Sequence, residues 1–165
     1  MFQMDSLPDA FARAAWERIA KDVEAPSELK KQMLEVLLRL HIRSADSREA
    51  VRALGAVVHR ASWGIPRLEQ LLSEQLDGTP TDEDKLEAIF HWFTLATHKL
   101  WRRGQIRALL KECPTRAILV RVGTDEGEVA PCGLKDGERL LASEETLKRI
   151  PPCSHPFCAC RWMLD

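Results

Sequence analysis

The stretch CSHPFCAC, residues 153–160, places three cysteines and one histidine within eight residues near the end of the chain. A further cysteine, Cys132, lies upstream beside Gly133. Thiolate and imidazole groups at such spacing are the ligands that tetrahedral zinc takes in structural sites. The stretch therefore predicts a structural zinc site, and the fold of the last third of the chain depends on it.

Five side chains are candidate ligands for this zinc ion: Cys132, Cys153, His155, Cys158 and Cys160. Alternate residues of an extended segment share one face, so Cys158 and Cys160 can approach the same ion. Structural sites usually join two segments of chain, which favours Cys132 as the remote ligand. Of the five, Cys153 is the expected substitute, and the other four form the favoured set.

The expected stability of the C-terminal module is the second argument for zinc. A module of about 50 residues with one short hairpin would bury too little apolar surface to be stable alone. A structural zinc compensates, because the free energy of metal binding becomes free energy of folding. Two alternatives remain open: reduced cysteines in a small metal-free core, or a catalytic zinc or iron–sulfur centre.

The overall composition favours one domain, or one domain with a small appendage, in a reducing compartment. The 165 residues are 45% hydrophobic with a formal net charge of −1, so the totals do not suggest a nucleic-acid binder. No apolar run reaches the roughly 18 residues of a membrane span, and the N-terminus lacks a signal-peptide pattern. Cysteines in odd number at one end are typical of metal ligands, and we expect a cytoplasmic protein.

Before the cysteines, the sequence is helical in pattern. Apolar residues recur at intervals of three and four in five stretches: Leu7 to Ile19, Leu29 to Leu40, Val51 to Val58, Leu68 to Leu76 and Leu86 to Leu100. Asp46 with Glu49 and Thr81 with Asp84 predict capping boxes at the starts of the third and fifth helices. Gly104 is expected to divide the fifth helix from a short segment that follows.

The pattern changes after Cys113. Residues 117–122 are rich in β-branched side chains and predict a strand, with residues 128–130 as its partner across a turn. Residues 143–150 predict a short helix. We therefore expect a mainly α protein: a bundle of about five helices over residues 1–112, followed by a small zinc-stabilised α+β module over residues 113–165.

The C-terminal motif resembles that of a known family. The string PPCSHPFCACR, residues 151–161, resembles the "PP-x-HP-x-CRC" ending of the Mu F-like phage head morphogenesis (minor head) proteins. An upstream C-x2-C-x2-L-D-G element precedes that ending in the family, and Cys132, Asp136 and Gly137 stand at its second cysteine and its Asp-Gly pair. The resemblance covers roughly residues 116–162, with both halves in the right order.

Three positions depart from the family pattern. Val129 stands where the first cysteine would fall, Cys153 is an addition, and Ala159 takes the place of an arginine that appears instead at 161. The resemblance implies a metal-linked structural element in a protein of portal and capsid assembly. It also implies a phage or prophage head component as partner, and the virion as location.

A basic stretch near the end of the fifth predicted helix suggests a second function. Its cationic residues are Lys99, Arg102, Arg103, Arg107, Lys111 and Arg116, with Trp101 among them. Cations and aromatic rings together can follow a phosphate backbone and stack on bases. The alternatives are a solvated helix end, or a basic surface that faces the acidic residues 69–87 within the fold or in an oligomer.

These observations favour a non-enzymatic structural or assembly protein with one structural zinc and with protein partners or further copies of itself. A zinc-containing nucleic-acid-binding protein is the alternative, and a metal-dependent enzyme is the third hypothesis. No glycine-rich phosphate loop, nucleophile elbow or dinucleotide fingerprint is present, so an enzyme is not favoured. Glu87 and His91, one helical turn apart, could transfer protons, but a structural histidine is the favoured interpretation.

Overall fold

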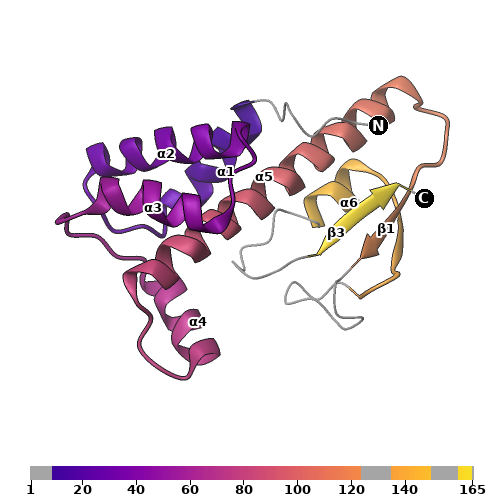
Figure 1. Cartoon of the computed structure of the whole chain (residues 1–165). Coiled ribbons are helices and arrows are strands. Elements are labelled where there is room, and N and C mark those ends of the chain that lie inside the picture. Colours follow the sequence, from indigo (N-terminus) through magenta and orange to yellow (C-terminus); the bar gives the residue numbers. More distant parts are fainter. Residues whose placement is uncertain (1–8, 124–134, 150–159, 165) are drawn as a thin grey trace. The chain divides into compact units, whose positions relative to one another are not determined.

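The chain folds as two compact units (Figure 1). A computed structural model describes residues 9–123, 135–149 and 160–164. The first unit is Met1–Thr97 and the second is His98–Asp165. The division falls inside one helix, which contributes residues to both units.

The first unit consists of helices, as the sequence predicts. They are α1 (Asp9–Ala20), α2 (Ser27–Ile42), α3 (Ser47–Val58), α4 (Pro66–Leu76) and the first turns of α5 (Asp82–Glu112). Figure 1 shows α2 and α3 side by side. Across the described ranges, no helix is both long enough and apolar enough to cross a membrane.

Apolar stripes on these helices form the core of the first unit. The stripe predicted for α2 is buried along its length, with Met33 and Leu37 fully enclosed. Phe93 of α5 is also fully enclosed, and the ring of His41 meets it edge-on, with centroids 6.0 Å apart. Since one large aromatic side chain of α5 lies inside this core, the first turns of α5 belong to the helical unit.

Both predicted capping boxes begin helices in the structure. Asp46 Oδ1 accepts a hydrogen bond of 2.8 Å from the Glu49 backbone N–H at the start of α3. At the start of α5, the Thr81 backbone N–H donates to Asp84 Oδ2 over 2.8 Å, and the Asp84 backbone N–H donates to Thr81 Oγ1 over 3.2 Å. Each bond satisfies a backbone N–H at a helix start or just before it, which fixes where the helix begins.

The prediction that Gly104 divides the fifth helix is wrong. Helix α5 runs through Gly104 to Glu112, a length of 31 residues. A helical glycine costs about 1 kcal/mol relative to alanine, and packing of the following turns offsets that cost. Ile106 is fully buried and Leu110 packs beside it in the core of the second unit. The compact units accordingly divide before Gly104, earlier than the boundary near residue 112 that the sequence predicts.

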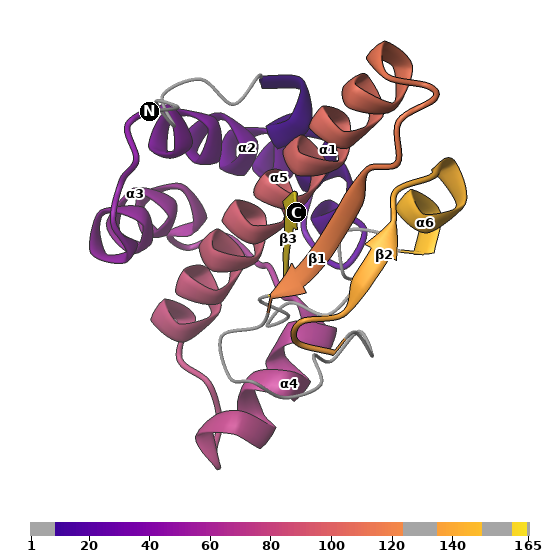
Figure 2. The same ribbon diagram turned by 90° about the vertical axis from the view of Figure 1, so that its right-hand side faces the viewer.

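The second unit contains a three-stranded antiparallel sheet in the order β2-β1-β3. The strands are β1 (Leu119–Gly123), β2 (Arg139–Leu141) and β3 (Arg161–Leu164), and helix α6 spans Glu144–Arg149. Figure 2 shows β1 beside β2, and α6 follows β2 along the chain. The predicted strand 117–122 corresponds to β1, which begins at Leu119, and the predicted helix 143–150 corresponds to α6, which the structure describes over Glu144–Arg149. The predicted partner strand, residues 128–130, lies outside the described residues, and the partners that the structure shows for β1 are β2 and β3.

One side of this sheet forms the core of the second unit. The buried members of the cluster are Ile106, Val120, Val122, Ala142, Leu147 and Trp162, and Leu110, Ile118 and Leu140 pack against it. Ser143 directly precedes helix α6, and its Oγ accepts a hydrogen bond of 3.1 Å from the Thr146 backbone N–H. The last turns of α5 and the helix α6 thus contribute buried residues to the same cluster as the inner face of the sheet.

Candidate functional site

Most of the predicted zinc ligands lie outside the described residues. This applies to Cys132, Cys153, His155 and Cys158, whereas Cys160 is described and is only 2% exposed. Within residues 9–123, 135–149 and 160–164, no group of three or more His, Cys, Asp and Glu side chains is arranged to hold a metal. The zinc site therefore stays a prediction.

The position of Cys160 fits the predicted role of a buried ligand. Cys160 directly precedes β3 and lies two residues before Trp162, so both side chains are on the same face of the extended segment. Trp162 belongs to the core of the second unit. A buried sulfur in that place can serve as a soft zinc ligand or as a small apolar group. No disulfide joins Cys160 and Cys113, the two cysteines that the structure describes.

The Asp136-Gly137 pair, at which the family resemblance was noted, forms the turn before β2. Gly137 has a φ of +77°, a backbone conformation that favours glycine. Its N–H donates to the Val122 carbonyl over 2.8 Å. A glycine is therefore favoured at position 137, because its positive φ lets the chain turn back toward β1.

Two residues of the predicted basic stretch lie on the same side of α5 as core residues of the second unit. Lys99 is 7% exposed, and Arg103 is half-buried. Lys99 and Arg103 are four residues apart on α5, and Ile106 and Leu110 continue the same helical face. Because Ile106 and Leu110 pack in the core, this face is not an exposed track for a phosphate backbone.

Of the other four basic residues, three lie on α5 in different surroundings, and Arg116 lies after α5 and is exposed. Arg102 Nη1 donates to Gln105 Oε1 over 2.9 Å, and Arg107 Nε lies 3.3 Å from Glu144 Oε2 of α6. Lys111 is exposed. The Arg107–Glu144 pair is largely solvated, so its contribution to stability is within about 1 kcal/mol. Among the described residues, the basic stretch is thus spread over several faces of α5.

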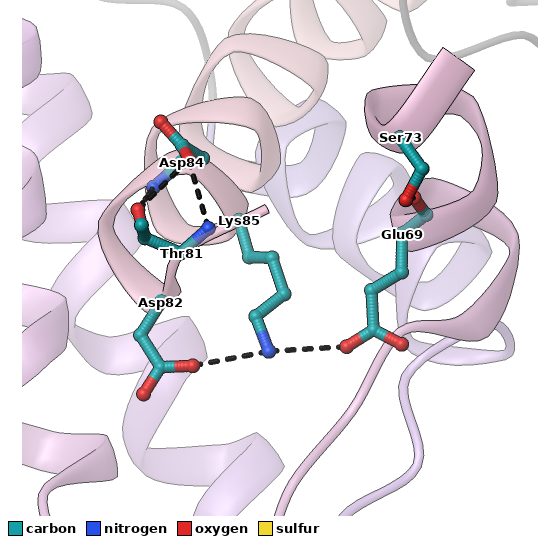
Figure 3. A network of polar contacts seen from close by, with 6 residues as sticks. All are labelled: Glu69, Ser73, Thr81, Asp82, Asp84 and Lys85. Carbon is teal, nitrogen blue, oxygen red and sulfur yellow. Dashed lines mark hydrogen bonds and ion pairs between the residues drawn. The ribbon is translucent and has the colours of Figure 1, made fainter. Parts of the chain in front are cut away.

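A polar network around Lys85 joins α4 to the first turn of α5 (Figure 3). Lys85 Nζ lies 3.0 Å from Asp82 Oδ1 and 3.1 Å from Glu69 Oε1. The same ammonium group is 5.0 Å from the centroid of the Trp63 ring. The partly buried ammonium group of Lys85 therefore links α5 to α4 and to the segment between α3 and α4.

The charge state of Lys85 follows from these contacts. Burial by itself lowers the pKa of Lys85, but the hydrogen bonds and negative charges of Asp82 and Glu69 outweigh it and raise the pKa above the ordinary 10.5. A catalytic lysine base needs a pKa near the working pH. Lys85 instead stays an ammonium ion, and its role is to hold the helices together.

An open depression with a volume of about 1010 Å³ lies in the first unit, between α3 and the start of α5. Arg48 and Arg52 line it on α3, while Glu83 and Glu87 line it on α5. No described residue forms an ion pair with any of these four. Basic side chains of α3 and acidic side chains of α5 thus line the same depression.

Two histidines of α5, His91 and His98, lie in different surroundings. Glu87 and His91 are exposed, and within residues 9–123, 135–149 and 160–164 no third metal-binding side chain groups with them. His98 is half-buried, and burial, together with the nearby Arg102, lowers the pKa of its imidazole. His98 is consequently neutral at physiological pH, which fits a structural role.

A charged surface of the second unit is not evident from the sequence alone. Arg121, Arg139 and Arg161 are exposed and lie on three different strands. Register places Arg121 directly opposite Arg139, and Arg161 opposite Gly123. The only local signal is the alternation of Arg121 with the buried Val120 and Val122, because the strand pairing that gathers the three arginines is non-local.

Comparisons with known proteins add no assignment. No protein-family model, curated protein or solved structure matches the chain. The resemblance of residues 116–162 to the Mu F-like head morphogenesis family therefore stays a prediction that depends on the quoted motif.

Proposed function

We propose that the chain is a non-enzymatic structural or assembly protein, in which a zinc-stabilised C-terminal unit is attached to a helical unit. The observation that carries the proposal is the burial of Cys160 at the start of β3, beside a core with few large side chains. When bound, zinc would supply cross-links between chain segments, and its binding free energy would add to the free energy of folding.

The residues of the second unit support this role in several ways. The sheet has strands of five, four and three residues, and its buried cluster has six members among the described residues. Sheets of this size are marginal without an additional constraint. The candidate ligands other than Cys160 fall in the two segments that flank β2 and α6 in the sequence. A cation that gathers them would fix both segments to the sheet.

The family resemblance adds a more specific element to the proposal. Residues 116–162 resemble the C-terminal motif of the Mu F-like head morphogenesis family, and β1, β2 and α6 lie inside this range. We accordingly propose a phage or prophage head component as the setting of the assembly role. Lys85, Arg102 and Arg107 make polar contacts with neighbouring side chains, which supports structural roles for these cations in a non-enzymatic protein.

The test is metal analysis of the wild type, of one double variant and of a single variant that serves as its control. Protein purified without a chelator is expected to contain one zinc per chain. Cys158→Ser with Cys160→Ser is expected to lose the metal and to make residues 114–165 sensitive to protease, while the helical circular dichroism signal of the first unit remains. Cys113→Ser is the control, because Cys113 is half-buried at the end of α5 and is not a candidate ligand.

Two results would contradict this proposal. One is wild-type protein that contains no metal and yet resists protease along the tail. The other is a catalytic activity that disappears with the metal, which would favour the enzyme hypothesis.

A further inference from the structure

The depression between α3 and the start of α5, which we name the charged groove, has walls of opposite charge. Arg48 and Arg52 are exposed and lie one helical turn apart on α3. Glu83 and Glu87 are exposed and likewise lie one turn apart on α5. None of these four side chains has an ion-pair partner among the described residues. Each wall of the groove therefore keeps its own charge.

Apolar residues line the charged groove between its walls. Val51 and Trp63 are partly exposed there, and Leu86 is buried. Gly55 of α3 is a neighbour of Leu86, since a Cβ added at Gly55 would stand 3.8 Å from Leu86 Cδ1, an ordinary van der Waals distance. Gly55 has no side chain to fill the space beside it. An apolar strip between charged borders has the composition of a protein interface, which has an apolar centre and a polar rim.

The opposite charges of the two walls limit the class of ligand. A nucleic acid carries a phosphate on every nucleotide, so the acidic wall would repel the backbone that the basic wall attracts. An extended peptide takes much of its affinity from main-chain hydrogen bonds to the edge of a sheet, whereas helices border this groove. A helix satisfies its own backbone hydrogen bonds and can carry acidic and basic side chains on opposite flanks of an apolar stripe.

The size of the charged groove also fits a helix. Two turns of a helix, about 11 Å long and about 10–12 Å across, occupy roughly 1,000 Å³. The volume of the groove is about 1010 Å³. The charged residues of each wall are one helical turn apart, which is also the spacing of neighbouring side chains along one flank of a helix. The groove can therefore take two turns of a helix.

We propose that the charged groove binds an amphipathic helix of a partner protein. Carboxylates on one flank of that helix pair with Arg48 and Arg52, cations on its other flank pair with Glu83 and Glu87, and its apolar stripe covers the apolar lining. The inference deepens the proposed assembly role, on which it rests, by naming the class of partner. The groove contains no candidate zinc ligand, so loss of helix binding and loss of metal are separate outcomes.

The experiment measures the binding of two synthetic helical peptides to the full chain by isothermal titration calorimetry. Both peptides have a stripe of alanine and leucine. The mixed peptide carries glutamates on one flank of the stripe and lysines on the other, whereas the acidic peptide carries glutamates on both flanks. Arg48→Glu with Arg52→Glu reverses the charge of the basic wall, and Glu83→Lys with Glu87→Lys reverses that of the acidic wall.

Two control variants make the same changes of charge outside the groove. They are Arg13→Glu with Arg18→Glu, and Glu17→Lys with Glu35→Lys, all at exposed positions of α1 and α2. Because each control matches the net charge of one groove variant, a difference between the two reports the position of the charge. Circular dichroism checks that all four variants are folded.

Wild type and controls are expected to bind the mixed peptide at least about tenfold more tightly than the acidic peptide. Each groove variant is expected to bind the mixed peptide at least about tenfold more weakly than its control does. Glu83→Lys with Glu87→Lys is also expected to prefer the acidic peptide, because both walls are then basic. This reversed preference cannot result from unfolding.

Wild-type protein that binds neither peptide, or binds both equally, would overturn the proposal. So would groove variants that bind the mixed peptide as tightly as their controls. Sedimentation velocity of the wild type without peptide tests a different occupant. Self-association that both groove variants abolish would assign the groove to a second copy of the chain and would equally overturn the proposal.

Discussion

The two units of this protein differ in how much of their stability their own cores supply. Of the eleven largest fully buried side chains among the described residues, only Ile106 and Leu147 belong to the second unit. The first unit encloses Phe93, Met33 and several leucines and isoleucines. Since buried apolar area is the main favourable term in folding, the first unit should be stable by itself. The second unit encloses fewer large side chains, and we propose that the cysteine- and histidine-rich segments supply it with a further constraint.

The largest predicted effect is in the core of the first unit. Replacement of Phe93 by alanine removes the largest fully buried side chain and is expected to lower the free energy of unfolding by about 3–5 kcal/mol. Urea denaturation followed by circular dichroism measures this loss. Ile42→Ala is the control, because Ile42 is exposed and its replacement should change stability by no more than about 0.5 kcal/mol. Equal losses for the two variants would contradict the assigned core.

A smaller and more local effect is expected in the second unit. Leu147→Ala removes a fully buried side chain of α6 and is expected to cost about 2–4 kcal/mol. Since the second unit has few other buried residues, we expect it to open locally. Limited proteolysis should then cleave after residue 112 while the helical unit stays intact. Leu141→Ala, at an exposed position, should leave the cleavage pattern unchanged, and loss of both units together in Leu147→Ala would show that they fold as one.

The smallest predicted effect is the pH dependence of the α5 capping box. Hydrogen bonds from the backbone N–H and then the hydroxyl of Thr81 lower the pKa of Asp84 below the ordinary 3.8. A carboxylate with a lowered pKa in the folded state stabilises the fold above its unfolded pKa, and this stabilisation disappears as the pH falls through the folded pKa. Asp84→Asn should therefore be less stable than wild type at pH 7. Denaturation at several pH values should show this difference shrinking below pH 3.8; a constant difference would contradict it.

The helical unit could be predicted closely from the sequence because its signals are local. Asp46 and Thr81 each lie three residues before the acidic residue of their capping box, and both boxes begin helices in the structure. The repeat of Leu29, Met33 and Leu37 is buried as predicted. The predicted helix end at Gly104 was wrong, because the free-energy cost of a helical glycine is small compared with the stabilisation from burying Ile106.

The second unit could be predicted only in part because its signals are non-local. Strands β2 and β3 have three and four residues, too few for a clear alternation. Strand pairing places Arg139 opposite Arg121 and Arg161 opposite Gly123, and no local pattern in the sequence predicts these pairs. Chemistry rather than periodicity indicates the zinc site, and Cys160 is the candidate ligand whose surroundings the structure describes.

Hydrogen exchange of the intact protein, with and without a strong zinc chelator, tests the central claim most directly. We expect one bound zinc per chain, and we expect the chelator to abolish protection of β1, β2, β3, α6 and the last turns of α5. Protection of α1, α2 and α3 should persist. Protection that stays the same in both units after the chelator is added, or the absence of zinc from well-protected protein, would contradict the account.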